Sequence, residues 1–289
     1  MQVSSNRIGD IRTYYTNTLV EVFPQAEAKF MVDAVLSFYT DIPALQLAIN
    51  LDKRVGESLL LKIHFAVKDL RKFKPLQYVL GETEFNGMRF YVTESVLIPR
   101  PETEELVNLI VEQYKGEKDL QILDLGTGSG CIAVSLSQAL SAKVLAADIS
   151  EEALSIARRN AKLNNADVVF KSYDILGDSS DDLIEGQFDI IVSNPPYVRE
   201  QEKQLMHDNV LKYEPELALF VEDSNPLVFY KAIAKLAHAK LSIDGQLWFE
   251  INEYLGKETE ALLLEHFRDV QLINDYKSNA RFIKATNPR

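Results

Sequence analysis

The stretch FDIIVSNPPYV, residues 188–198, combines a short apolar run with an abrupt stop at Asn194-Pro195-Pro196-Tyr197. The apolar run is typical of a fully buried strand. The two prolines lack backbone N–H donors and cannot continue a strand or a helix, so the chain leaves the sheet there. In an open α/β sheet, ligands bind beyond the carboxyl ends of the strands. The stretch therefore predicts an α/β sheet with Asn194 and Tyr197 at a crevice, although Asn-Pro by itself is also a common turn start.

Residues 194–197 suit the alkylation of a planar nitrogen. Such a nitrogen is a poor nucleophile because its lone pair is delocalised, and its NH2 group offers two hydrogens. The carboxamide oxygen of Asn194 and the carbonyl of Pro195 can each accept one hydrogen, which stabilises the positive charge that develops as the nitrogen attacks. Tyr197 would offer a flat face to the planar group and a π cloud to a cationic methyl donor. A strong general base is not required, because the alkylated nitrogen becomes acidic.

Composition places the chain among ordinary globular proteins. Its 289 residues, 46% hydrophobic and 26% charged, suit a small domain plus a larger one. No run approaches membrane-spanning length and residues 1–15 lack an apolar signal core, so we expect a cytoplasmic location. The single cysteine, Cys131, cannot form an internal disulfide. A net charge of −12 argues against stable nucleic-acid binding and is compatible with a basic protein partner. We expect no metal site.

The amino-terminal third reads as helical. Apolar residues recur at helical spacing between about Ile8 and Phe73, which predicts a small all-α bundle over residues 1–78 that grips a macromolecular substrate. Residues 79–103 then alternate apolar and polar side chains around Asn86-Gly87, which predicts a β-hairpin at about Thr83–Val92.

A proline-rich corner, Leu97–Glu104, follows the hairpin. It is either a rigid linker or, through Pro99–Glu102, a wall of the active site. Thr103 is expected to cap the helix that follows. The third segment, residues 104–289, would then form the catalytic domain.

A glycine-rich loop, Asp124-Leu125-Gly126-Thr127-Gly128-Ser129-Gly130, follows the first strand of this domain. Its glycines let the backbone approach a ligand and direct amides of a helix start toward it. The spacing differs from the dinucleotide fingerprint at the third glycine. Asp148 ends the next strand, where a carboxylate can bind both ribose hydroxyls of a nucleoside. Asp174 follows a third strand, either beside an adenine or in a solvated turn.

The carboxyl-terminal part continues the alternation of helices and strands. Its last two strand-like runs, VQLIN and ARFIKA, are close enough in sequence to form an antiparallel pair. We therefore expect a doubly wound sheet with its last strand reversed.

These motifs together resemble class I S-adenosylmethionine-dependent methyltransferases that modify amide or exocyclic nitrogens. Three further motifs make the chain similar to the HemK/PrmC family, the protein-glutamine methyltransferases of peptide chain release factors. They are Gly81–Phe85 with Gly87, Leu97–Glu104, and Glu214-Pro215 with Ala218-Leu219. The tetrapeptide at 194–197 alone is shared with adenine methyltransferases of DNA, whereas its combination with the proline-rich corner is far more specific.

The resemblance implies a Rossmann-like sheet of seven strands with an antiparallel last strand. It implies methyl transfer from S-adenosyl-L-methionine to the glutamine amide of the release factor's Gly-Gly-Gln motif, in translation termination. Asn194, Pro195, Pro196 and Tyr197 would hold the glutamine, with Asn194, Pro195 and Tyr197 catalytic. The implied cofactor contacts are Asp124, Gly126, Thr127, Gly128, Ser129, Gly130, Asp148, Asp174 and Asn194. Whether Tyr173 or Asp174 contacts the adenine stays open.

Other functions compete with this one. A DNA or RNA amino-methyltransferase of the adenine type would use the same Asn194 chemistry but should carry a basic face, whereas this chain has 31 basic and 43 acidic residues. A cytosine carbon methyltransferase needs a nucleophilic cysteine, and Cys131 is expected to pack against the sheet. A nicotinamide dehydrogenase leaves residues 194–197 unexplained. A non-catalytic cofactor-binding partner module is the remaining alternative.

Overall fold

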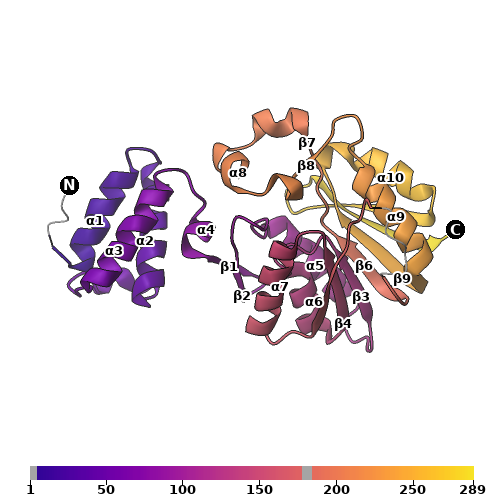
Figure 1. The fold of residues 1–289 in the computed structure, drawn as a ribbon, viewed down its shortest axis with the longest axis horizontal. Coiled ribbons are helices and arrows are strands. Elements are labelled where there is room, and N and C mark those ends of the chain that lie inside the picture. The colour runs from indigo at the N-terminus through magenta and orange to yellow at the C-terminus, as the bar shows by residue number, and fades with distance from the viewer. Residues whose placement is uncertain (1–4, 178–183) are drawn as a thin grey trace. The chain divides into compact units, whose positions relative to one another are not determined.

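The computed structural model describes residues 5–177 and 184–289, which divide into two compact units (Figure 1). The first contains residues 5–81 together with Asp208–Tyr213, and the second contains Glu82–His207 and Glu214–Arg289. None of the helices in the described ranges is long and apolar enough to cross a membrane.

The first unit is a helical bundle held by an apolar core. Its core side chains recur at helical spacing, such as Ile11, Tyr15 and Leu19 on one helix. An ion pair between Arg12 and Asp33, with Nη2 2.7 Å from Oδ2, ties this helix to the next. The elements are α1 (Ile8–Leu19), α2 (Gln25–Thr40), the 3-10 helix η1 (Ala44–Ile49), α3 (Glu57–Leu70) and α4 (Leu76–Leu80).

A segment far away in sequence belongs to this bundle. The helix α8 (Asp208–Tyr213) groups with the first unit although the residues on both sides of it belong to the second. The Tyr213 hydroxyl donates to the Lys72 carbonyl at 2.9 Å. A segment inserted between two parts of the second unit therefore belongs to the bundle.

The predicted hairpin is confirmed. Strands β1 (Glu82–Phe85) and β2 (Met88–Tyr91) pair antiparallel, with Phe85 opposite Met88. Asn86 and Gly87 have φ angles of 48° and 69°, as the favoured two-residue hairpin turn requires. The Asn86 amide also donates to Glu104 Oε1 at 2.9 Å, which attaches the hairpin to the helix after the proline-rich corner.

The second unit is built on a seven-stranded sheet in the order β10-β11-β9-β6-β3-β4-β5. Strand β11 is antiparallel to both of its neighbours, and the remaining pairs are parallel. The expected sheet with a reversed last strand is therefore confirmed. The strands are β3 (Gln121–Leu125), β4 (Lys143–Asp148), β5 (Val168–Ser172), β6 (Phe188–Ser193), β9 (Leu241–Glu250), β10 (Phe267–Asn274) and β11 (Ala280–Pro288).

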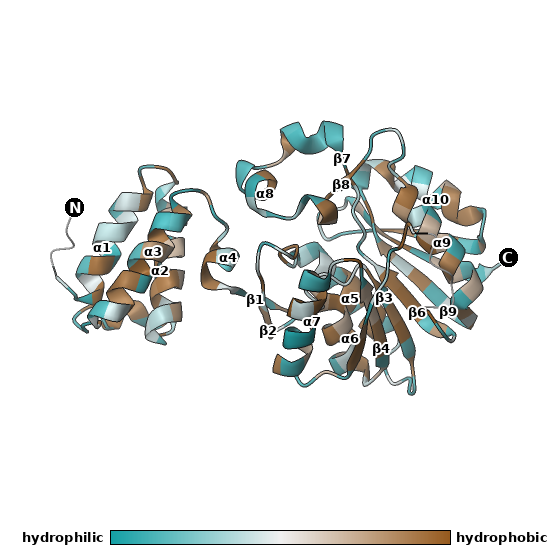
Figure 2. Cartoon of the chain, viewed as in Figure 1, coloured by the Kyte–Doolittle hydropathy of each residue, from teal (hydrophilic) through white to brown (hydrophobic). Residues whose placement is uncertain are grey.

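Helices cover both faces of this sheet (Figure 1). Successive residues of β6 point to opposite faces, so Ile190 and Val192 join one apolar core while Ile191 joins the other. The central strands are accordingly apolar along their length, as the brown ribbons of Figure 2 show. One face packs on α5 (Pro101–Gln113), α6 (Cys131–Leu140) and α7 (Glu151–Leu163), and the other on α9 (Val228–Lys240) and α10 (Gly256–Leu264).

The strand order places the site. The chain runs from β3 to β4 and β5 on one side and then returns to β6 on the other side of β3. This reversal opens a crevice at the carboxyl ends of β3 and β6, where ligands bind in sheets of this kind. Short elements surround this edge: β7 (Val198–Arg199), which is parallel to β8 (Phe220–Val221), and the 3-10 helices η3 (Glu200–Leu205), η4 (Glu216–Ala218) and η5 (Glu253–Leu255).

Candidate active site

The glycine loop between β3 and α6 adopts a backbone that favours glycine. Gly126, Gly128 and Gly130 have φ angles of 74°, 53° and 79°. A Cβ on Gly130 would also lie 3.1 Å from the Cβ of Ala157, so glycine allows α6 and α7 to approach each other. The loop therefore presents backbone, without side chains at three of its positions, at the carboxyl edge of the sheet.

Asp148, the last residue of β4, organises the loop beside it. Its Oδ2 accepts a hydrogen bond from the Gly128 amide at 2.8 Å, and its Oδ1 accepts one from the Ser150 amide at 3.0 Å. Ser150 in turn caps α7 by accepting from the Ala153 amide at 3.1 Å. Burial raises the pKa of the Asp148 carboxyl, and the backbone amides that donate to it oppose that shift.

Asp124 lies behind the loop and is fully buried. Its Oδ2 accepts from the Thr127 hydroxyl at 2.6 Å, and its Oδ1 has no hydrogen-bond partner among the residues with described positions. Burial raises the pKa of Asp124 to about 7, with the nearby Asp148 charge acting in the same direction. Asp124 therefore supports the loop from beneath, and its contact with the cavity is through Thr127.

A cavity of about 560 Å³ connects the glycine loop to the end of β6. This volume is in the range of small-molecule sites. Of the residues predicted to bind cofactor or substrate, those that line it are Gly126, Thr127, Gly128, Ser129, Asp148, Asp174, Asn194 and Pro196. Asp124, Gly130, Pro195 and Tyr197 do not line it. Tyr173 and Asp174 both do, so the cavity alone does not choose between them.

The proline-rich corner forms a wall of this cavity through Leu97, Pro99 and Arg100. Arg100 Nη2 donates to Glu214 Oε1 at 2.6 Å, and the buried Glu214 side chain also accepts from the Ile98 amide at 3.3 Å. Pro215, next to Glu214, lines the cavity too. The ion pair thus holds two walls of the cavity together.

Asn194 and Tyr197 make different contacts. Asn194 is half-buried and its Nδ2 donates to the Thr103 hydroxyl at 3.2 Å. The Tyr197 hydroxyl donates to Glu250 Oε1 at 2.9 Å, and its carbonyl accepts from Asn252 Nδ2 at 3.0 Å. Burial and the neighbouring Glu250 carboxylate raise the pKa of Tyr197, so its hydroxyl stays protonated.

The expectation that Thr103 caps α5 was wrong. The helix begins at Pro101, with Arg100 in the capping position, because proline suits the first turn of a helix. Thr103 therefore lies inside the first turn, 3% exposed, and its hydroxyl donates to Glu250 Oε2 at 2.7 Å.

Glu250 is a site-supporting residue that sequence reasoning missed. It is the last residue of β9, and the preceding residue Phe249 pairs with Ser193 of β6. Glu250 and Asn194 therefore leave adjacent strands at the same level. An acidic residue at the end of an apolar strand was the available signal.

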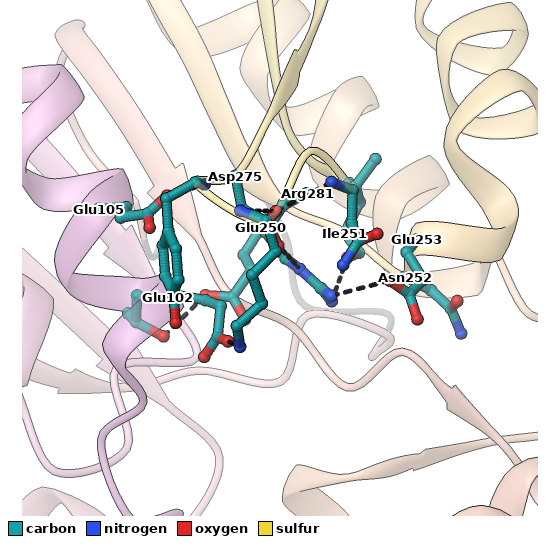
Figure 3. A network of polar contacts seen from close by, with 12 residues as sticks. Glu102, Glu105, Glu250, Ile251, Asn252, Glu253, Asp275 and Arg281 are labelled. Carbon is teal, nitrogen blue, oxygen red and sulfur yellow. Dashed lines mark hydrogen bonds and ion pairs between the residues drawn. The ribbon is translucent and has the colours of Figure 1, made fainter.

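Arg281 supplies a positive charge close to Glu250 (Figure 3). Its guanidinium lies 3.2 Å from the Glu253 carboxylate and 3.5 Å from the Asp275 carboxylate, and it donates to the Ile251 carbonyl at 3.5 Å. The neighbouring carboxylates and Tyr197 favour the charged form and raise the pKa of Arg281, against the effect of burial. Arg281 therefore offsets part of the negative charge of the carboxylates around it.

Cys131 fits no nucleophilic role. Its side chain is buried, and burial raises the pKa of its thiol. A protonated thiol is a weak nucleophile. The structure agrees with the expectation that Cys131 packs beside the sheet.

Known proteins share sequence and fold with this chain. The methyltransferase small domain family matches residues 103–216. A crystal structure of a methyltransferase from Pyrococcus furiosus shares the fold, with a TM-score of 0.51 and 19% sequence identity, over 79% of this chain and 97% of that one.

Two full-length relatives are much closer in sequence. A release factor glutamine methyltransferase of Flavobacterium psychrophilum is 46% identical, over 96% of this chain and 98% of the relative. One of Bacteroides thetaiotaomicron is 42% identical, over 95% and 98%. With near-complete coverage of both chains at this identity, the chain belongs to the family of release factor glutamine methyltransferases.

Proposed function

We propose that this protein transfers a methyl group from S-adenosylmethionine to the side-chain amide nitrogen of the glutamine in the Gly-Gly-Gln motif of peptide chain release factors. The observation that carries the proposal is the single cavity lined at one end by the glycine loop and Asp148 and at the other by Asn194. A methyl donor and an amide nitrogen held at these two ends would face each other.

The residues present fit S-adenosylmethionine. The loop at Gly126–Ser129 offers close backbone approach, and the Asp148 carboxylate can accept hydrogen bonds from two ribose hydroxyls. Apolar side chains at the rim, Ile149 and Leu176, are 48% and 45% exposed and would cover an adenine ring next to Tyr173 or Asp174. When bound, the cofactor supplies an electrophilic methyl group.

Asn194 would hold the nucleophile. Its Nδ2 is engaged by Thr103, so its Oδ1 is the atom available to accept a hydrogen from the glutamine amide. The carbonyl of Pro195, between two residues that line the cavity, is proposed to accept the second hydrogen, and Tyr197 to pack against the amide plane. Two acceptors that hold both amide hydrogens stabilise the positive charge that develops on the attacking nitrogen.

No strong base is required in this scheme. The methylated nitrogen carries an extra proton and is acidic, so it can release that proton to water. The buried carboxylates Glu250 and Asp124 are consistent with this scheme. Each already accepts hydrogen bonds from hydroxyl groups, and neither lines the cavity.

The test is mass spectrometry of a purified release factor, with DNA in a parallel reaction, after incubation with the protein and S-adenosylmethionine. One added methyl on the Gly-Gly-Gln glutamine is expected, and none when that glutamine is replaced by glutamate. Asn194→Ala should lose about 2 to 4 kcal/mol of transition-state stabilisation, the scale for one preorganised polar group. Methylated adenine beside an untouched release factor would overturn the substrate assignment. A loss below about tenfold, with cofactor binding intact, would overturn the role of Asn194.

A further inference from the structure

A buried chain of hydrogen bonds links Glu250 to Asn194. Asn194 Nδ2 donates to Thr103 Oγ1 at 3.2 Å, and Thr103 Oγ1 donates to Glu250 Oε2 at 2.7 Å. The other carboxylate oxygen of Glu250 accepts from the Tyr197 hydroxyl at 2.9 Å. Glu250 and Thr103 are only 1% and 3% exposed. Three elements, α5, β9 and the loop after β6, therefore meet in one network that ends at the cavity.

Each hydrogen bond in this network has a defined donor and a defined acceptor. Both oxygens of Glu250 accept, one from the Thr103 hydroxyl and the other from the Tyr197 hydroxyl. The single hydroxyl hydrogen of Thr103 is used on Glu250, which leaves only lone pairs facing Asn194. The Asn194 amide must therefore turn its NH2 group toward Thr103. Its Oδ1, which accepts no hydrogen bond from any described residue, is left for a ligand.

The surroundings of Glu250 act on its carboxyl in opposite directions. Burial raises the pKa of this carboxyl and the charge of Glu102 adds to the effect, whereas the hydroxyls of Thr103 and Tyr197 and the charge of Arg281 lower it. Both carboxylate oxygens thus accept a hydrogen bond, and a guanidinium lies nearby (Figure 3). Hydroxyl donors and a nearby positive charge are the groups that offset the cost of burying a carboxylate.

We propose that Glu250 and Thr103 are positioning residues that fix the Asn194 amide with its oxygen toward the substrate. The inference rests on the proposed function, because the substrate NH2 group is a donor and requires an acceptor facing it. In the reversed orientation, the Asn194 NH2 would meet the substrate NH2, and two donors repel each other. The charge of Glu250 also polarises the chain, which strengthens Oδ1 as an acceptor for the positive charge that develops on the nitrogen.

The test compares Thr103→Val with Thr103→Ser. Valine keeps the shape of threonine and removes the hydroxyl, while serine keeps the hydroxyl. Thr103→Val should lower kcat by about ten- to a hundredfold and leave cofactor affinity, measured by calorimetry, unchanged. Thr103→Ser should retain the rate to within about threefold. If Thr103→Val unfolds, Thr103→Ala supplies the same comparison at smaller volume.

A matched control and a double mutant separate positioning from packing. Thr259 is also fully buried and donates to the Leu255 carbonyl at 2.8 Å, but it lies on α10 outside the cavity lining, so Thr259→Val should keep full turnover. If Thr103 acts only through Asn194, adding Thr103→Val to Asn194→Ala should cost less than about twofold more.

Two results would overturn the proposal. One is Thr103→Val turning over within about twofold of the wild type, and the other is a Thr103→Val loss that adds in full to that of Asn194→Ala. A wild-type protein that leaves the release factor unmethylated would instead refute the proposed function, so the two failures are distinguishable.

Discussion

Replacing Asp148 by alanine should weaken the binding of S-adenosylmethionine to the protein. The carboxylate now accepts from the Gly128 and Ser150 amides at 2.8 and 3.0 Å while lining the cavity. It therefore shapes the glycine loop and, in the proposed function, would accept from two ribose hydroxyls. A hydrogen bond to a charged group contributes about 1.5 to 3 kcal/mol. Losing two such bonds to the ribose amounts to at least about 3 kcal/mol, or roughly a hundredfold weaker binding.

The assay is calorimetric titration with S-adenosylmethionine. Asp148→Asn provides a graded comparison, because its amide keeps the shape but can accept from only one of the two backbone amides. We expect it to bind roughly tenfold more weakly than the wild type, between the wild type and Asp148→Ala. Asp244→Ala, which removes an exposed acid outside the cavity lining, is the charge-matched control. Affinity of Asp148→Ala within about threefold of that of the control would refute the ribose assignment.

Substitutions at three other positions test the groups that support the site. The pKa of Asp124 is raised from 3.8 to about 7, so the free energy of unfolding should be highest below pH 4 for this group and fall by about 4 kcal/mol as pH rises through 7. The free energy of unfolding of Asp124→Asn, measured in urea at each pH, should lack that decline. The same pH dependence in this variant and in the wild type would contradict a raised pKa of Asp124. Glu214→Gln weakens the pair with Arg100, so chemical unfolding should show a loss of about 1 to 3 kcal/mol; unchanged stability would argue that the walls are held otherwise. Tyr197→Phe removes the hydrogen bond to Glu250 and Tyr197→Ala removes the ring as well, so methyl-transfer assays should show the larger loss for alanine; equal losses would exclude a role for the ring.

The parts of this protein that could be predicted are those that short sequence motifs specify. Asn86-Gly87 between two alternating runs specified the hairpin because few other residues tolerate two consecutive positive φ angles. The glycine loop and Asp148 were likewise found from their order along β3 and β4. Each of these signals spans a few residues, and each depends on backbone sterics that the rest of the fold does not change.

Long-range partners were not predictable in the same way. Thr103 has the residue type of a helix cap, and the hydroxyl that would cap α5 instead reaches Glu250, 147 residues further along the chain. The Tyr197 hydroxyl is likewise held by Glu250. The helix α8 joins the first unit from a position between two segments of the second. A polar side chain can satisfy its hydrogen bonds locally or across the fold, and only the packed structure decides between them.

The free-energy cost of burying Glu250 can be explained by the need to orient Asn194. A buried carboxylate is destabilising unless it is paired and hydrogen-bonded, and here it needs two hydroxyls and the charge of Arg281. An apolar residue at the end of β9 would pack more cheaply but would leave the Thr103 hydroxyl free to turn either way. Asn194 could then present its oxygen or its NH2 group to the cavity. Stabilising a transition state requires dipoles that are already oriented when charge develops. In the proposed mechanism, the buried Glu250 carboxyl group therefore orients the Thr103 hydroxyl, and this hydroxyl orients the Asn194 amide toward the substrate.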